Sequence, residues 1–240
     1  MCVQTLISEI QVKGELHMMD EFHRLVEMIN DEELRDKVAS LLKDPGIDLG
    51  GPMLRFDEAP GGAYVHHAYE GGLLEHTVAM VHICVTLCDL TERVYGGEID
   101  RDVVLAGALV HDVMKCYAYS SVGGGFFRTS ALGDRVGHLT LLVSELLKRG
   151  FPLDVVHVAA SHHGEQSPVK PKTLEALIVS IADLADSEFS RKSLRAAEYL
   201  VRETTGRRNK FGSSREALEL LGLKAREGWD GVRSFNSKGK

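Results

Sequence analysis

The sequence predicts an all-α protein, a bundle of helices with one small hairpin or flap near residues 117–132. Two patterns support this fold class. Apolar residues recur every three or four positions in successive segments, and capping residues or glycines bound those segments. The alternation of apolar and polar residues that marks a strand does not occur outside residues 117–132. A chain of 240 residues is long enough to bury a core of its own.

Two helices are predicted before residue 44. Asp20 can cap the first, and Asp31 can cap the second, which has acidic residues at its positive N-terminal end. Their apolar faces are Phe22, Leu25, Val26 and Ile29, then Leu34, Val38, Leu41 and Leu42. Residues 44–62 are rich in glycine and proline, too irregular for a helix. Three side chains are expected to hold this connection to the surface: Leu54, Phe56 and Tyr64. Residues 1–16 show no clear pattern.

The next two predicted helices are strongly apolar. The first, at residues 73–88, turns five side chains inward: Leu74, Val78, Val81, Val85 and Cys88. The second, at residues 103–115, contains three small residues that allow a neighbouring helix to approach closely: Ala106, Gly107 and Ala108. Three consecutive glycines at 123–125, flanked by aromatic residues, then indicate a hairpin or a mobile flap.

Two further helices follow. The first spans residues 134–148, with His138 in its first turn, and Pro152 begins the second, whose end carries His162 and His163 before a glycine. Their inward residues are Val136, Leu139, Leu142, Val143, Leu146 and Leu147, then Val155, Val156, Val158 and Ala159.

The C-terminal third is predicted as several helical pieces. Residues 173–187 form one helix, with Asp183 and Asp186 near its C-terminal end. Its expected inward face is Leu174, Leu177, Ile178, Ile181 and Leu184. Carboxylates oppose the dipole at that end of a helix, so a nearby cation would explain them. The remaining pieces are residues 195–202 and 214–221, both helical, and a loose segment from 227 to 240.

Charge is unevenly distributed along the chain. The net charge is -7, yet residues 1–190 carry 15 basic and 29 acidic side chains, whereas residues 191–240 carry 13 basic and 6 acidic ones. A basic tail on an acidic body marks either a nucleic-acid contact or a solvated flank. We therefore expect a domain at residues 1–190, on which the helices at 20–43 pack, and a basic helical extension at 191–240.

Several classes of protein have no support in the sequence. No run of 18 uncharged apolar residues and no basic region before an apolar N-terminus occur, so neither a membrane span nor a secretory leader is expected. The four cysteines form no CxxC pair, as in a reduced, cytoplasmic protein. The motifs GxxxxGK[ST], GxGxxG after a strand and GxSxG are absent, which gives no support to nucleoside triphosphatases, dinucleotide enzymes or serine hydrolases.

The doublet His111-Asp112 at the end of an apolar helix is the strongest chemical signal. A buried carboxylate without a partner costs several kcal/mol by rough estimate. Either Asp112 pairs with Lys115 and His111 is a core histidine, or both bind a metal ion. Further ligand types occur at or within other predicted helices: His76, His138, His162, His163 and Asp183. Imidazoles with carboxylates suit a divalent transition metal, and an aspartate can bridge two ions.

The succession His76, His111-Asp112 and Asp183 resembles the H…HD…D signature of HD-domain metal-dependent phosphohydrolases. The chain is more similar still to the HD domain of YhaM-type bacterial 3'-5' exoribonucleases. The matching stretches, within roughly residues 25–190, are His66–Thr77, Leu105–Asp112, Gly137-His138, Ser161–Glu165 and Ser167–Ala176. Three features depart from the family pattern and none removes a ligand: Met114, Leu132 and a shorter loop after Glu165.

The resemblance implies an HD helical bundle with one or two divalent transition metal ions, among Mn, Ni, Co, Fe and Zn. It assigns one metal to His76, His111, Asp112 and Asp183, and a second to Asp112, His138 and one or both of His162 and His163. Asp112 and Lys115 are the implied catalytic residues, with Lys115 neutralising a phosphate oxygen unless it is a surface lysine. Asp186 would support the ligands. Substrate contacts are expected from His66, His67, Lys170, Arg207 and Arg208.

Three functions fit these expectations. The first is a 3'-5' exonuclease on single-stranded RNA or DNA, for which the flap at 117–132 would open to admit a polymer. The second is a phosphohydrolase for cyclic or mononucleotides. The third is a non-catalytic module that senses a nucleotide, against which the complete ligand set argues. The partners are therefore a single strand or a nucleotide and no membrane, with oligomerisation open.

Overall fold

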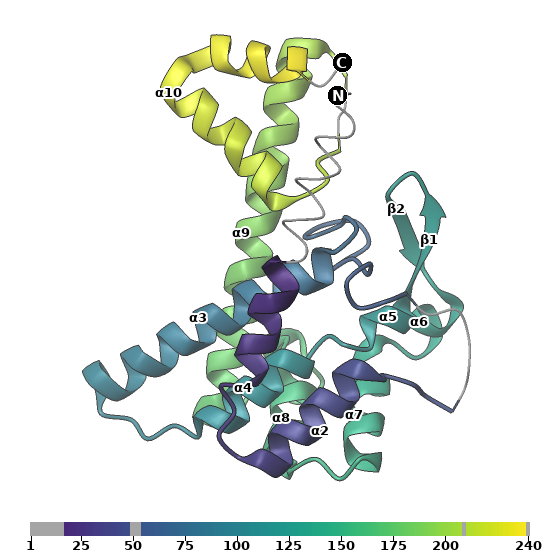
Figure 1. The fold of residues 1–240 in the computed structure, drawn as a ribbon, viewed down its shortest axis with the longest axis vertical. Helices are drawn as coiled ribbons and strands as arrows, with labels where there is room; N and C mark the ends of the chain where they lie inside the picture. Colours follow the sequence, from purple (N-terminus) through teal and green to yellow (C-terminus); the bar gives the residue numbers. More distant parts are fainter. Residues whose placement is uncertain (1–16, 49–53, 208–209, 239–240) are drawn as a thin grey trace.

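The computed structural model describes residues 17–48, 54–207 and 210–238. Within them the chain is helical apart from loops and one two-stranded antiparallel hairpin (Figure 1), which confirms the predicted fold class. Residues 17–26 are helical, and the labelled elements are α2 (Glu32–Lys43), α3 (Gly72–Tyr95), α4 (Arg101–Val110), α5 (Lys115–Ala118), β1 (Tyr119–Gly123), β2 (Phe126–Thr129), α6 (Ala131–Arg135), α7 (His138–Lys148), α8 (Leu153–Ser161), the 3-10 turn η1 (Gly164–Gln166), α9 (Leu174–Thr205) and α10 (Ser214–Lys238).

Helix α4 is the centre of the bundle. It packs against α2, α3, α8 and α9, and every residue from Val103 to Val110 is buried. A Cβ on Gly107 would lie 2.3 Å from Cγ1 of Val158, so no larger residue fits between α4 and α8. The close approach predicted from the small residues is confirmed, and it brings the ends of α4 and α8 together.

The predicted start of the bundle is largely confirmed. Asp31 caps α2, its carboxylate accepting a hydrogen bond from Leu34 N at 3.0 Å. The apolar residues of the preceding helix are buried: Phe22, Leu25, Val26 and Ile29. Leu54 and Phe56 pack on the core as expected, but Tyr64 is 74% exposed and does not. Residues 1–16, which include Cys2, lie outside the described residues.

The helix expected at residues 134–148 is wrong in its first turn. Gly137 has a φ of 78°, a conformation that only glycine adopts readily, and it separates α6 from α7. Val136 is consequently half exposed instead of inward. His138 becomes the first residue of α7, at a helix end where its ring can turn toward the bundle. The glycines at 123–125 all have positive φ and form the turn of the β1–β2 hairpin.

Helix α9 differs most from the expectation. It is one helix of 32 residues, so Asp183 and Asp186 lie in its middle and the helix-dipole argument does not apply. Most of the apolar residues expected inside are outside: Leu174, Leu177 and Ile181 are each 45% exposed, and Leu184 is 61% exposed. Ile178 is buried as expected, beside Val179, but the rest of the buried face in this part of α9 holds small and polar residues, namely Ala176, Ser180, Ala182, Asp183 and Asp186. The apolar stripe failed as a guide because this helix turns its ligands inward.

The C-terminal residues are more ordered than predicted. Helix α9 runs without interruption through residue 190, and α10 continues to Lys238 through a bend at Gly228. Helix α10 folds back along α9 (Figure 1), and the two share an apolar cluster that includes Tyr69, Leu194 and Phe211. The expectation of a loose segment from 227 onward is therefore wrong for its described residues. The division at residue 190 remains a prediction.

Helix α3 is long and apolar enough, by length and composition alone, to cross a membrane. Half of its most apolar stretch is buried inside the protein, and a core helix passes the same test. Packing of α3 against α4 and α9 accounts for its apolar character.

Candidate metal centre

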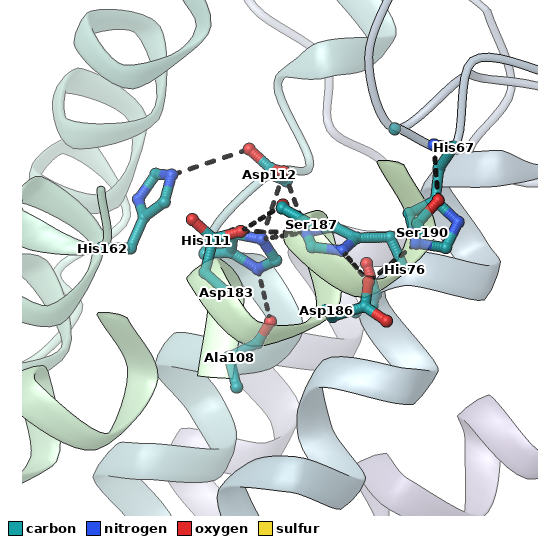
Figure 2. Close-up of polar contacts among 12 residues, drawn as sticks. His67, His76, Ala108, His111, Asp112, His162, Asp183, Asp186, Ser187 and Ser190 are labelled. Carbon is teal, nitrogen blue, oxygen red and sulfur yellow. Dashed lines mark hydrogen bonds and ion pairs between the residues drawn. The ribbon is translucent and has the colours of Figure 1, made fainter. Parts of the chain in front are cut away.

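The predicted ligands meet where several helices begin, end or cross (Figure 2). His76 lies one turn inside α3. Asp183 lies in the middle of α9, and α9 packs against α3. His111 and His162 cap the C-terminal ends of α4 and α8, and His138 begins α7. Side chains at helix ends and on packed helices are held firmly, as a ligand must be. The sequence places these five residues up to 107 positions apart, and the bundle brings them together.

Asp112 lies between two groups of imidazoles. Its Oδ2 lies 3.1 Å from Nε2 of His111 and 3.6 Å from Nε2 of His76, and its Oδ1 lies 3.3 Å from Nε2 of His138 and 3.7 Å from Nε2 of His162. The first group is His76, His111 and Asp183; the second is Asp112, His138, His162 and His163. Ligands bound to one ion at about 2.1 Å lie roughly 3.0–3.4 Å apart, so these spacings suit two neighbouring ions.

Hydrogen bonds fix which ring nitrogen faces the centre. Nδ1 of His111 donates to the carbonyl of Ala108 at 2.8 Å (Figure 2). Nδ1 of His162 donates to the carbonyl of Ala159 at 2.7 Å. Each bond leaves Nε2 with its lone pair directed at the centre, as second-shell contacts of metal-bound histidines do. Among the described residues, Oδ1 of Asp112 and Nε2 of His138 and His162 are buried without a hydrogen-bond partner. A divalent cation fits this donor set.

The electrostatics of the centre also suit a cation. Burial opposes ionisation of Asp112, but Lys115 and His111 outweigh it and hold the pKa of the carboxyl well below its usual range. Burial lowers the pKa of His138 to about 4 and that of His162 well below its usual value, so both stay neutral and able to bind metal. At His76, hydrogen bonds to Asp183 and Asp186 outweigh burial and raise the pKa to about 9, so a proton is held there when no cation is present.

A family model described as HD domain matches residues 73–188, which contain the whole H…HD…D set. The chain is 39% identical over 213 residues to the dihydroneopterin 2',3'-cyclic phosphate phosphodiesterase of Methanocaldococcus jannaschii, covering 88% of this chain and 85% of that one. The chain belongs to the HD-domain phosphohydrolases. It is a metal-dependent enzyme of that family, and its metal identity is not shown by the likeness.

The similarity to YhaM-type exoribonucleases is more distant. The 3'-5' exoribonuclease YhaM of Bacillus pumilus is 26% identical over 194 residues, which cover 76% of this chain and 57% of that enzyme. YhaM of Bacillus subtilis is 28% identical over 146 residues, 56% of this chain and 44% of that enzyme. The HD phosphohydrolase described here thus spans about half the length of these relatives. No solved structure matches the chain.

Lys115 of this HD phosphohydrolase is buried and not the surface lysine that was the alternative. Its ammonium contacts Oδ2 of Asp112 and donates to the carbonyl of Gly61 at 2.5 Å. The pairing of Asp112 with Lys115, considered from sequence as a purely structural explanation, is therefore present together with the convergent imidazoles. Asp112 outweighs burial at this lysine and raises its pKa, so the ammonium stays charged.

A chain of hydrogen bonds extends from His76 to the start of α10. Nδ1 of His76 lies 2.6 Å from Oδ2 of Asp186, which also lies 2.7 Å from Nε2 of His67 (Figure 2). Nδ1 of His67 lies 2.8 Å from the hydroxyl of Tyr69, and that hydroxyl lies 2.6 Å from Oγ of Ser214. Both ring nitrogens of His67 are thus occupied, which leaves neither for a substrate. Sequence reasoning missed Tyr69 and Ser214, because residues 145 positions apart give no local signal.

The remaining predicted substrate residues differ in burial and in their distance from the metal centre. The ring of His66 lies 5.8 Å from that of His76, with Nε2 buried and without a partner, and burial lowers its pKa to about 4. Lys170 is exposed and pairs with Glu165, and Arg207 is exposed after the end of α9. Arg208 lies outside the described residues.

Tyr119 was not selected from the sequence. Burial raises the pKa of its hydroxyl, which accepts a hydrogen bond from the backbone of Ala63 within the fields of Lys115 and Asp112. Tyr119 is the first residue of β1, so the hairpin begins near the metal centre.

Proposed function

We propose that this enzyme hydrolyses a small cyclic phosphodiester attached to an aromatic heterocycle, and that the polymer-degrading activity considered first is not its main one. The relative that supports this proposal is named for a 2',3'-cyclic phosphate. The alignment with this relative covers 88% of the chain, so it must include part of residues 191–240. The basic extension is therefore shared, at least in part, with an enzyme whose named substrate is small, and it does not by itself imply a polymer.

The observation that carries the hydrolytic chemistry is the position of Asp112. One carboxylate oxygen faces each imidazole group, and both are buried: Oδ2 contacts the Lys115 ammonium, whereas Oδ1 has no hydrogen-bond partner among the described residues. A pair of divalent transition metal ions held there would polarise phosphoryl oxygens and lower the pKa of a bound water toward neutrality. His76, His111 and Asp183 would hold one ion, and His138, His162 and His163 the other. Imidazole-rich sets suit Mn, Fe, Co, Ni or Zn.

The protein's own groups then position the substrate. Opening a cyclic phosphodiester with water breaks one phosphorus–oxygen bond of the ring and leaves a monoester beside a free hydroxyl group. His66 is neutral at pH 7 and has an unused buried nitrogen, so it can hydrogen-bond to the substrate at the edge of the centre. The hydroxyl of Tyr119 lies near Lys115, whose charge lowers the cost of placing a phosphate near Asp112.

The test is a matched substrate panel. Nucleoside 2',3'-cyclic phosphates, a 5'-labelled single-stranded RNA and nucleoside monophosphates are incubated with the enzyme and with Mn, Fe, Co, Ni or Mg. We expect opening of the cyclic phosphates to a monoester to have the highest kcat/KM, and Asp112→Asn to abolish it. Degradation of the RNA to mononucleotides with a higher kcat/KM would overturn the proposal in favour of the exonuclease.

A further inference from the structure

A cavity of about 580 Å³ lies beside the C-terminal half of α9. Its walls are the C-terminal half of α9, residues 63–65 and 68–69 of the loop before α3, the turn end of β2 and residues 210–211 just before α10. None of the residues in the metal groups lines it. The volume is that of a site for one small organic molecule.

The cations of the cavity are too far from the metal centre for one small substrate to reach both. Helix α9 rises about 1.5 Å per residue, so Arg195 lies roughly 13 Å along the axis from Asp186, and Arg202 roughly 24 Å. A cyclic phosphate with its phosphorus at Asp112 would not extend along the length of this cavity. The cavity therefore needs an occupant of its own.

Aromatic rings are unusually exposed around this cavity. Tyr64 is 74% exposed, Phe126 is 54% exposed and Tyr199 is 49% exposed. The floor beneath them is closed by buried apolar groups, among them Leu194 and Phe211. Exposed rings over a closed floor provide stacking surfaces for a flat heterocycle.

Cations surround the same rings. Arg195, Arg202 and Lys210 line the cavity with one acidic residue, Glu198, and none of the three forms an ion pair with a described carboxylate. Arg191, one turn before Arg195 on the same helix, is by contrast paired with Glu188 at 2.5 Å. On a chain of net charge -7, unpaired cations gathered in one cavity favour an anionic ligand.

Two of these cations, Arg202 and Lys210, lie close to the exposed aromatic rings. The guanidinium of Arg202 lies 5.7 Å from the ring centroid of Tyr199, and Nζ of Lys210 lies 4.5 Å from that of Phe126. Lys210 also donates to the carbonyl of Gly125 at 2.8 Å, which ties the hairpin turn to the segment before α10. A ring stacked here would have its attached phosphate within reach of a positive charge.

We infer that this cavity binds a phosphorylated aromatic heterocycle, with the ring against Tyr199 or Phe126 and the phosphate at Arg195, Arg202 and Lys210. The ligand chemistry is that of a nucleotide, either free or as one unit of a single strand. The site is separate from the metal centre and does not depend on the substrate proposed for it.

The experiment measures binding of guanosine 5'-monophosphate to the full chain by calorimetry, with EDTA present so that no metal-held phosphate contributes. Guanosine and ribose 5-phosphate test the need for ring and phosphate separately. Tyr199→Ala removes a stacking ring, Arg195→Glu with Lys210→Glu reverses two charges, and Arg202→Gln is a milder change should the reversal unfold the protein. Arg233→Glu, on the exposed side of α10, is the matched charge control.

Guanosine 5'-monophosphate should bind the wild type and the Arg233→Glu control with equal affinity. It should bind the wild type at least tenfold more tightly than guanosine or ribose 5-phosphate does. Its affinity for the cavity variants should be at least tenfold lower. A short single-stranded RNA in a parallel titration separates the two sources: tighter binding of the strand identifies a nucleotide within a polymer, and weaker binding identifies a free one. Absence of binding by both ligands, or binding that the cavity variants retain, would overturn the inference. Loss of binding in Asp112→Asn would also overturn it, because the ligand would then be at the metal centre.

Discussion

Oδ2 of Asp186 accepts a hydrogen bond from Nδ1 of His76 at 2.6 Å, within the buried interior of the bundle. This contact holds the His76 ring so that Nε2 faces His111 at 3.2 Å and Asp183 at 3.2 Å. Two imidazole nitrogens at that distance repel unless a proton or a metal ion lies between them. Asp186 is thus a positioning residue for a metal ligand, although it belongs to neither of the two ligand groups around Asp112.

Asp186→Asn should weaken metal binding about 10–100-fold, as removal of a second-shell carboxylate does. The amide keeps the size of the side chain but removes the charge that His76 and His67 contact. Titration of the metal against a chromophoric chelator measures the affinity, and Asp230→Asn, an exposed position on α10, is the matched control. Equal affinities in the two variants would show that Asp186 has no part in holding His76.

Lys115→Met should destabilise the metal-free protein by about 3–5 kcal/mol, because it leaves the Asp112 carboxylate buried without its cation. Added Mn²⁺ should recover much of that loss, since the ion would take over the role of the ammonium. Urea unfolding with EDTA and with Mn²⁺ measures both values. Lys148→Met, whose partner Asp48 is on the surface, should change little in either condition. A loss unchanged by metal would mean that Lys115 acts through packing alone.

Gly107→Ala should lower the free energy of unfolding by about 1–3 kcal/mol, the usual cost of overpacking a core. The added methyl group would meet the side chain of Val158 at 2.3 Å, and α4 and α8 would have to separate. Because these helices end at His111 and His162, metal affinity should fall as well. At Gly212, where the nearest atom to an added Cβ is 3.9 Å away, the same substitution should be tolerated. Equal stability of the two variants in thermal unfolding would contradict the packing argument.

Cys84, Cys88 and Cys116 should resist iodoacetamide at pH 8 in the folded protein. All three are buried, and burial raises the pKa of Cys88 to about 11, that of Cys116 to about 12 and that of Cys84 above its usual range. Peptide mass spectrometry should find them unmodified natively and fully modified in guanidinium. Native labelling of Cys84 would contradict its position in the core.

The sequence by itself determined the fold class, most helix starts and the identity of the ligand types. Capping at Asp31 and the stop after His162 are local effects of a few neighbouring residues, so a local pattern is enough to predict them. The signature His76, His111-Asp112 and Asp183 predicted a metal site because imidazoles and carboxylates occur at several predicted helices in the order of the HD family.

The tertiary structure decided the features that depend on which helix faces pack together. The apolar stripe of α9 pointed to the wrong side, because the inner face of that helix is occupied by Asp183 and Asp186 and their histidine partners. The hydrogen bond from Tyr69 to Ser214 and the cavity beside Arg195 join residues far apart in the chain. Contacts of this kind arise when helices pack, and no periodicity along the sequence records them.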